Sequence, residues 1–341
     1  MNCCPNCFND DFLAKQIKDI SVDIGRCDYC KAEKTATIDA VLLSDYFHPL
    51  IDLYDISEDG ESLVDLLKKG WMLFLTIDND IARILIEDIL EIKLNSLFIP
   101  KTNIDVTNIL NWQDFKNELK HDNRYFPKKA PSYDHLKGLL QYLIMPNGVV
   151  PNYLYRARVN EDENPIHIDF MGKPPSKKST AGRANPMGIP YLYTASNAQT
   201  AIAEIRPHKG DSVTVAKFDI LEPLKLADLR NPRQSISPFV LVEDELNQIF
   251  LDLDYLCHLG EELSKPILPR EAHLEYLSSQ YLCELIKHCG FDGVVYKSSV
   301  GDGDNFAIFY DEKLKPNEIK YYKVDNVSFE VGEKMNFEDT Q

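Results

Sequence analysis

Apolar residues recur at helical spacing along the first part of the chain, between about residues 38 and 143. The helices predicted there are Ser62–Phe74, Ile81–Ile92 and Tyr133–Ile144. The first begins with a serine, a residue type that caps helices with its side-chain oxygen. Asn103–Pro131 lacks this periodicity and is predicted to be rich in loops. The turn residues Pro146-Asn147-Gly148 then mark the best domain boundary in the chain.

Beyond that boundary, segments typical of strands and helices are mixed. The predicted strands are Tyr153–Val159, Tyr191–Thr194, Ser212–Phe218, Gly293–Tyr296, Phe306–Tyr310 and Tyr321–Val331. The predicted helices are Asn197–Arg206, Phe239–Tyr255 and Arg270–Cys289. Because the helices are grouped rather than alternating strictly with the strands, the pattern predicts an α+β fold.

Five of the eight cysteines lie in the first thirty residues. Cys4 and Cys7 form one C-x-x-C pair and Cys27 and Cys30 form a second, with nineteen residues between the pairs. This spacing is typical of a zinc ribbon or treble clef, and the alternatives are a redox pair or unrelated thiols. With four thiolate ligands no position is left for a reactive water, so the predicted zinc ion is structural. Cys3 fits neither pair and is predicted to be a spare or reactive thiol.

The chain has 341 residues and a formal net charge of −17, which excludes a general nucleic-acid-binding surface. An anionic small molecule would need a locally basic pocket, to which Lys173, Lys177 and Lys178 could contribute. No apolar run reaches the roughly 18 residues of a membrane span, and the N-terminal residues lack a signal-peptide pattern. We therefore expect a cytoplasmic protein without membrane contact.

Five residues are candidates for a binding or catalytic site. Glu204 is a lone carboxylate in an Ala-rich helical segment. Burying an acid there costs free energy, so its presence indicates a functional role. Arg183 lies in a turn-rich loop, and Arg156 lies on a predicted strand. Tyr193 belongs to the short aromatic strand before Glu204, and Ser298 lies far downstream. The competing neighbours are Arg158, Tyr191 and Ser299.

These residues, in the order Arg, Arg, Tyr, Glu and Ser between about Tyr153 and Val331, resemble the RES domain, a family named for its Arg, Glu and Ser residues. Members of this family are bacterial toxins that consume NAD on a fold like that of ADP-ribosyltransferases. The resemblance therefore implies a split, mixed β-sheet and NAD as the substrate. It also implies that Arg156, Arg183 and Tyr193 bind the substrate, and that Glu204, Tyr193 and Ser298 are catalytic.

Cleavage of the bond between ribose and nicotinamide develops positive charge on the ribose. A carboxylate such as Glu204 would stabilise that charge, as carboxylates do in glycosidases. Tyr193 would stack on the nicotinamide, and Arg156 and Arg183 would bind the pyrophosphate, because a guanidinium can contact two phosphate oxygens at once. Ser298 would orient the ribose or the amide.

We expect three parts: a zinc ribbon at 1–36, a helical domain at 37–148 and the catalytic domain at 149–335. The helical part resembles the HEPN-like region that accompanies some RES domains. HEPN ribonucleases carry an Arg-x4–6-His motif, but Arg124 and His135 lie too far apart to form it. This part is therefore predicted to be a scaffold or sensor. The catalytic part differs from the family in a long helical insert, Asn231 to Cys289, whose role the sequence leaves open.

The predicted function is cleavage of NAD by an enzyme of toxin or defence type, either an NAD glycohydrolase or an NAD phosphorylase. One alternative is transfer of ADP-ribose to a macromolecule, and another is an inactive, zinc-dependent interaction protein. Relatives are usually paired with an antitoxin that covers the active site. Here the fused N-terminal half is expected to serve as a regulator or as a homo-oligomerisation surface, alongside or in place of such a partner.

Overall fold

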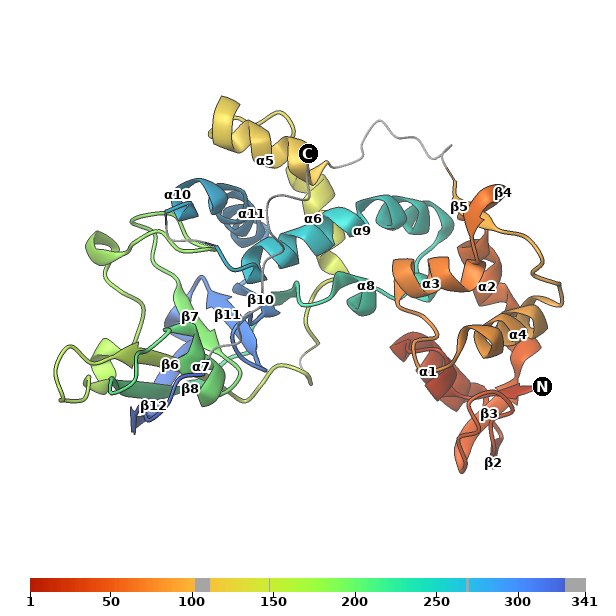
Figure 1. The fold of residues 1–341 in the computed structure, drawn as a ribbon, viewed down its shortest axis with the longest axis horizontal. Helices are drawn as coiled ribbons and strands as arrows, with labels where there is room; N and C mark the ends of the chain where they lie inside the picture. Colours follow the sequence, from red (N-terminus) through yellow and green to blue (C-terminus); the bar gives the residue numbers. More distant parts are fainter. Residues whose placement is uncertain (102–110, 147, 268–269, 329–341) are drawn as a thin grey trace, which may run out of the picture. The chain divides into compact units, whose positions relative to one another are not determined.

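The computed structural model describes residues 1–101, 111–146, 148–267 and 270–328. The chain, coloured from its N-terminus to its C-terminus in Figure 1, forms two compact units. Unit 1 comprises Met1–Ile144, Asp228–Leu263 and Pro269–Tyr281, and unit 2 comprises Met145–Ala227, Ser264–Leu268 and Leu282–Gln341. Most of the helical insert thus groups with the N-terminal residues. The predicted boundaries at 36 and 148 remain predictions, and Asn147 lies outside the described residues.

Unit 1 begins with a small sheet in which β3 (Thr35–Asp39) lies between β1 (Asn2–Cys3) and β2 (Asp23–Gly25), both antiparallel to it. Helix α1 (Asp11–Ile20) lies between β1 and β2 in the chain and is capped by the side chain of Asp10. Helix α2 (Ser44–Ile51) follows the sheet and contributes the buried Phe47. The rings of Phe8, Phe47 and Phe74 are fully buried and pack against one another in the core of this unit.

The next helices of unit 1 follow the predicted periodicity. Helix α3 (Leu63–Trp71) is capped by Ser62, whose side chain accepts a hydrogen bond from the Asp65 amide. Helices α4 (Asn79–Leu90) and α6 (Tyr133–Gln141) lie where the sequence predicts them. A hairpin of β4 (Tyr54–Glu61) and β5 (Phe98–Pro100) was not predicted, because β4 is mostly exposed and polar.

The prediction that Asn103–Pro131 is rich in loops holds for residues 123–131 but misses a helical stretch at 112–122, and residues 102–110 lie outside the described part. Helix α5 (Trp112–Asn117) begins at the Asn111 cap and continues into a π-helical turn, Glu118–Asp122. The helix is too short to show a repeating pattern, and the burial of Trp112 and Phe115 stabilises it. Both rings pack against Tyr255.

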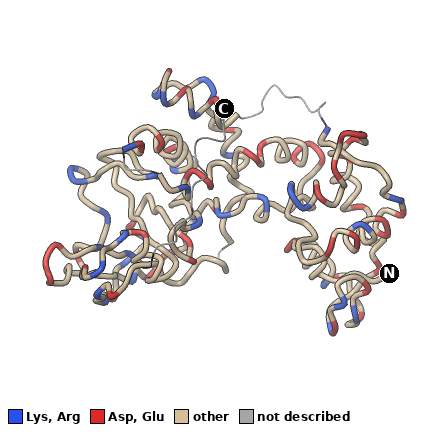
Figure 2. Tube along the Cα trace, viewed as in Figure 1, with Lys and Arg blue, Asp and Glu red and all other residues tan. Residues whose placement is uncertain are grey.

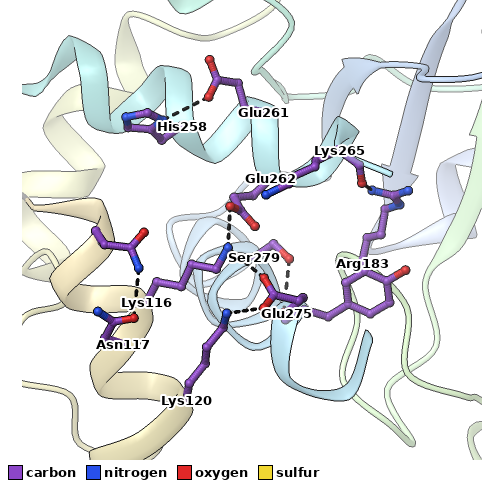
Figure 3. A network of polar contacts seen from close by, with 12 residues as sticks. Lys116, Asn117, Lys120, Arg183, His258, Glu261, Glu262, Lys265, Glu275 and Ser279 are labelled. Atoms are coloured by element: carbon purple, nitrogen blue, oxygen red, sulfur yellow. Dashed lines mark hydrogen bonds and ion pairs between the residues drawn. The ribbon is translucent and has the colours of Figure 1, made fainter. Parts of the chain in front are cut away.

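Tyr255 lies on α9 (Glu243–Ser264), the longest described helix and the centre of the insert, which α8 (Pro232–Ser235) precedes. Phe250 of α9 stacks on Trp71. Buried ion pairs also link these helices. Lys116 of α5 lies 2.6 Å from Glu262 Oε1 and 3.0 Å from Glu275 Oε2, while Lys120 pairs with Glu275 (Figure 3). The insert therefore completes the core of unit 1.

The predicted helix at Arg270–Cys289 is two helices, α10 (Ala272–Glu275) and α11 (Leu277–His288). Unit 2 contains, within its described residues, a seven-stranded sheet in the order β12-β8-β6-β7-β11-β10-β9. These strands are β6 (Tyr153–Val159), β7 (Leu192–Ala195), β8 (Ser212–Ile220), β9 (Leu226–Asp228), β10 (Gly293–Lys297), β11 (Asp304–Ile308) and β12 (Leu314–Lys323). Helix α7 (Ala198–Glu204) connects β7 to β8. The predicted α+β class is confirmed.

One feature of this sheet matters for the site, and another corrects a predicted strand. Strand β6 has a long register with β8, but it pairs with β7 only through Tyr155 and Ala195, so the sheet is split at this point. Strand β12 begins at Leu314, seven residues before the predicted start at Tyr321. That prediction missed Leu314–Lys320 because the strand is rich in charged residues and contains Pro316, which an edge strand tolerates. The predicted residues 329–331 lie outside the described part.

Candidate active site

The register of four strands places one row of side chains across the split in the sheet. Tyr155 of β6 lies opposite Ala195 of β7, Ala195 opposite Asn305 of β11, and Asn305 opposite Tyr296 of β10. All four residues line a cavity of about 280 Å³. Arg156, Arg183, Tyr193 and Glu204 line the same cavity, so four of the five residues predicted from the sequence meet there.

Glu204 reaches this cavity because α7 lies close to the sheet. The helix begins at Asn197, whose side chain caps it by accepting from the Thr200 amide at 2.8 Å. Ala201 on the helix packs with Ala157 and Ala195 on the strands, and these small side chains allow a close approach. Glu204 is the last residue of the helix, and its side chain lines the cavity where the helix ends.

Ser298, the fifth predicted residue, contacts Glu204 directly. Its hydroxyl donates to Glu204 Oε1 at 2.6 Å. The same Oγ accepts from the amides of Val300 and Gly301, at 3.2 and 3.0 Å. Because two amides point at the oxygen, the hydroxyl proton is directed to the carboxylate. This geometry favours Ser298 over Ser299.

The turn that carries Ser298 joins β10 to β11, which confirms the hairpin predicted at Gly301–Asn305, although its last two residues belong to β11. The turn lies tightly against α7. A Cβ on Gly303 would lie 2.6 Å from Thr200 Oγ1, and the Gly303 amide donates to that oxygen at 3.0 Å. Glycine at this position thus permits the close approach that brings Ser298 to Glu204.

Arg156 is a half-buried cation with one donor that makes no hydrogen bond to any described residue. That donor atom, Nη1, is itself buried. Burial, with a smaller contribution from Arg158, lowers the pKa of Arg156 to about 10. Arg158 is exposed and donates to the Phe170 carbonyl at 2.9 Å. Of the two arginines, only Arg156 lines the 280 Å³ cavity.

A second, larger cavity of about 1080 Å³ shares Arg156, Gly182 and Tyr193 with the first, so the two are adjacent. Lys173 and Lys178 line it, as the sequence suggested, but Lys177 does not. Lys173 is paired with Asp311 at 2.6 Å. A ligand longer than the first cavity would extend into this space.

Tyr193 organises the loop that carries Arg183. Its hydroxyl donates to Asn185 Oδ1 at 2.7 Å and accepts from the Ala184 amide at 3.0 Å. The side-chain amide of Asn185 donates to the Thr180, Pro186 and Ile189 carbonyls, which closes the loop on itself. The Arg183 guanidinium donates to the Lys265 carbonyl, also within unit 2 (Figure 3).

Tyr191, the alternative to Tyr193, has a structural role. Its hydroxyl hydrogen-bonds Glu284 and its ring packs on Phe309 at 4.7 Å.

Three residues that line the two cavities were not predicted from the sequence: Asn185, Asn305 and Tyr296. Burial, together with the charges of Tyr193 and Glu204, raises the pKa of Tyr296 well above its usual value, so its phenol stays protonated. The period-two alternation of their strands could have placed Tyr296 and Asn305 on the site face.

The four cysteines of the two C-x-x-C pairs form a cluster in unit 1. Their sulfur atoms all lie within 4.8 Å of one another, with Cys4 to Cys30 and Cys7 to Cys27 both at 3.4 Å. Tetrahedral zinc thiolate sites, with bonds of about 2.3 Å, separate sulfur atoms by about 3.8 Å, so this donor set fits a metal ion. Cys3 is outside the group and fully buried.

Figure 2 shows Lys and Arg interspersed with Asp and Glu along the trace of each unit. In the part of the chain that the structure describes, no helix has the length and apolar character needed to cross a bilayer.

The family model described as the RES domain matches residues 153–329, just over half of the chain. Among solved structures, the chain is similar to one from the Mycobacterium tuberculosis MbcT–MbcA toxin–antitoxin complex. The identity is 15%, the match covers 55% of this chain and 92% of that chain, and the TM-score is 0.32. No curated protein matches the chain.

Proposed function

Because the chain belongs to the RES domain family, we propose that unit 2 is an NAD-consuming enzyme of toxin type that cleaves the bond between ribose and nicotinamide. The observation that carries this proposal is the environment of Glu204. Its Oε1 accepts from two neutral donors, Ser298 Oγ and Asn305 Nδ2, each at 2.6 Å. No described cation forms an ion pair with it, so its negative charge remains available to a ligand in the cavity.

This environment suits a reaction that develops positive charge. Departure of nicotinamide leaves an oxocarbenium-like ribose, which a fixed carboxylate stabilises more than it stabilises the ground state. Neutral donors keep Glu204 in place without cancelling its charge. Arg156, whose buried Nη1 lacks a partner, and Arg183 would bind the pyrophosphate, and the Tyr193 ring would contact the nicotinamide.

The acceptor of the ADP-ribosyl group is open among three classes. Water yields ADP-ribose and nicotinamide with release of a proton, whereas phosphate yields a phosphorylated ADP-ribose. A nucleophile on a macromolecule would make the protein a mono-ADP-ribosyltransferase. Each acceptor can use the same bond cleavage, so Glu204 has the same role in all three.

The test is incubation of the purified full chain with NAD, with and without inorganic phosphate, followed by mass spectrometry of the products. We expect free nicotinamide in both samples and a phosphorylated product only where phosphate is the acceptor. Transfer would instead attach ADP-ribose to the protein itself or to added macromolecules. Failure to release nicotinamide under all these conditions would refute the proposal.

We further propose that the cysteine cluster binds one zinc ion. The four thiolates leave no open coordination position, so zinc would stabilise the fold of unit 1 and take no part in the reaction. Elemental analysis of the purified chain is expected to give one zinc per chain.

An enzyme that consumes NAD needs a control, and we propose that unit 1 provides it, as a regulator, as a homo-oligomerisation surface or as the docking site of an antitoxin. Deleting residues 1–145 would be a poor test, because it removes the partners of Phe239, Phe250 and Tyr255. A better comparison uses the full chain and Cys27→Ser, measuring mass by light scattering and growth inhibition on expression. Identical results for both proteins would remove support for a regulatory unit 1.

A further inference from the structure

We propose that Asn305 is a positioning residue that fixes the Glu204 carboxylate for the reaction, an inference that rests on the proposed function. Asn305 Nδ2 lies 2.6 Å from Glu204 Oε1. The asparagine is only 6% exposed, and it lines the 280 Å³ cavity together with Glu204. A buried amide beside a carboxylate in a cavity acts on that carboxylate and on whatever binds it.

The backbone around Asn305 makes it the more rigid of the two donors. Its strand, β11, lies inside the sheet, and Asn305 itself is opposite Ala195 on one side and Tyr296 on the other. Ser298, in contrast, lies in the turn after β10. A side chain anchored between two strands holds its donor in one direction better than a turn residue does.

The two donors converge on the same oxygen of Glu204. The second oxygen, Oε2, accepts no hydrogen bond from the residues that the structure describes. It is therefore the oxygen available to a substrate hydroxyl or to the developing positive charge. The neutral amide fixes the direction of Oε2, whereas a lysine or arginine in place of Asn305 would cancel the charge that the reaction uses.

The first test compares Asn305→Ala with the parent in NAD turnover. Loss of a hydrogen bond to a charged group should lower kcat by about 10- to 100-fold, while KM changes by less than about threefold. Asn160→Ala is the matched control, because Asn160 is 8% exposed, lies in the same unit and bonds Thr214 rather than Glu204. The control should retain the parental kcat.

The second test uses Asn305→Asp, which preserves shape and also decides the question if Asn305→Ala does not fold. Two carboxylates at hydrogen-bond distance cannot both ionise easily, so they share a proton. The acid limb of the pH–rate profile should therefore move to higher pH, a change that a merely structural asparagine would not produce. An unshifted profile, or a kcat loss no greater than that of Asn160→Ala, would overturn the proposal.

A third measurement separates this proposal from the proposed function. If the parent chain does not consume NAD, the proposed function fails, and crystal structures of the parent and Asn305→Ala then test Asn305 alone. We expect the Glu204 carboxylate to turn away from its parental position, or to occupy several positions, in Asn305→Ala. An unchanged, single position of Glu204 in that variant would refute the positioning role.

Discussion

Charged side chains have different partners in the core of unit 1 and around the cavity of unit 2. In unit 1 buried ions lie in pairs: Lys116 lies close to Glu262 and Glu275, and His135 Nε2 lies 2.9 Å from the fully buried Asp252. In unit 2 the carboxylate of Glu204 is bound by neutral groups, and Arg156 Nη1 is buried without a described partner. Ion pairs within a core hold helices together, whereas charged groups without a counter-ion around a cavity are typical of a ligand-binding site. The comparison agrees with the proposal that the chemistry takes place in unit 2, while the ion pairs of unit 1 stabilise its fold.

The largest effect is expected from Glu204→Ala. In the proposed mechanism the carboxylate acts on transition-state charge, so kcat should fall by about three orders of magnitude, equivalent to roughly 4 kcal/mol. NAD affinity and the melting temperature should change little. The exposed Glu222→Ala in the same unit is the control and should match the parent. Parental turnover by Glu204→Ala at saturating NAD would make the RES-type site assignment wrong.

Cys27→Ser tests the comparison from the side of unit 1. Structural zinc sites contribute their binding energy directly to folding, so the variant should lose the metal and melt at a lower temperature. Its kcat, measured below that temperature, should equal the parental kcat. Cys257→Ser removes a half-buried cysteine outside the cluster and should keep both the metal and the stability. Retention of one zinc per chain by Cys27→Ser would contradict the assignment.

Lys116→Met breaks the buried ion network of unit 1. Removing Lys116 leaves the buried Glu262 with uncompensated charge, whereas Glu275 keeps Lys120, so the free energy of unfolding should fall by about 3 kcal/mol in chemical denaturation. Lys129→Met removes an exposed ion pair with Asp114 and should leave stability unchanged within error. Equal stability of the two variants would show that the network does not stabilise unit 1.

Arg183→Ala should affect binding more than chemistry. Losing one guanidinium contact to the pyrophosphate should raise KM by about 10- to 100-fold, with a smaller change in kcat. Lys177→Ala makes the same change of charge but lines neither cavity, so its kinetics should be parental. A kcat loss with unchanged KM would assign Arg183 to the transition state instead.

The smallest effect concerns pH. The Asp252 carboxylate, whose Oδ2 lies 2.9 Å from His135 Nε2, raises the pKa of His135 above its usual 6.5. The pair therefore contributes full stability below pH 6.5, and this contribution is lost as the pH rises through the raised pKa. His135→Gln should remove this part of the pH dependence of stability. Parallel stability curves for the two proteins would contradict this role of the pair.

Sequence alone predicted the parts of the molecule whose signal is local. The alternation in Tyr153–Val159 gives β6 with its observed ends, and the Ser62 cap marks the start of α3. Glu204 was conspicuous because an acid in an Ala-rich helix conflicts with its surroundings. The cysteine cluster could be predicted because the spacing of the two C-x-x-C pairs is visible in the sequence itself.

What sequence could not predict depends on contacts between distant residues. Asn305 and Glu204 are 101 positions apart in the sequence. Asn305 becomes a site residue only because β11 pairs with β7, which brings its side chain to Glu204 at the end of α7. Helix α5 is stabilised by the ring of Tyr255 rather than by its own periodicity. The grouping of the insert with unit 1 likewise depends on aromatic contacts that no local pattern encodes.

The order of strands in the sheet also determines when the site is completed during synthesis. Strand β11 lies between β7 and β10, yet it is among the last strands to leave the ribosome. A nascent or truncated chain that ends before Asp304 has Arg156, Arg183 and Glu204 but lacks Asn305 and the strand that joins β7 to β10. Most of the chain is therefore synthesised before the site can assemble. Incomplete translation products contain the charged residues of the site but not the sheet that positions them.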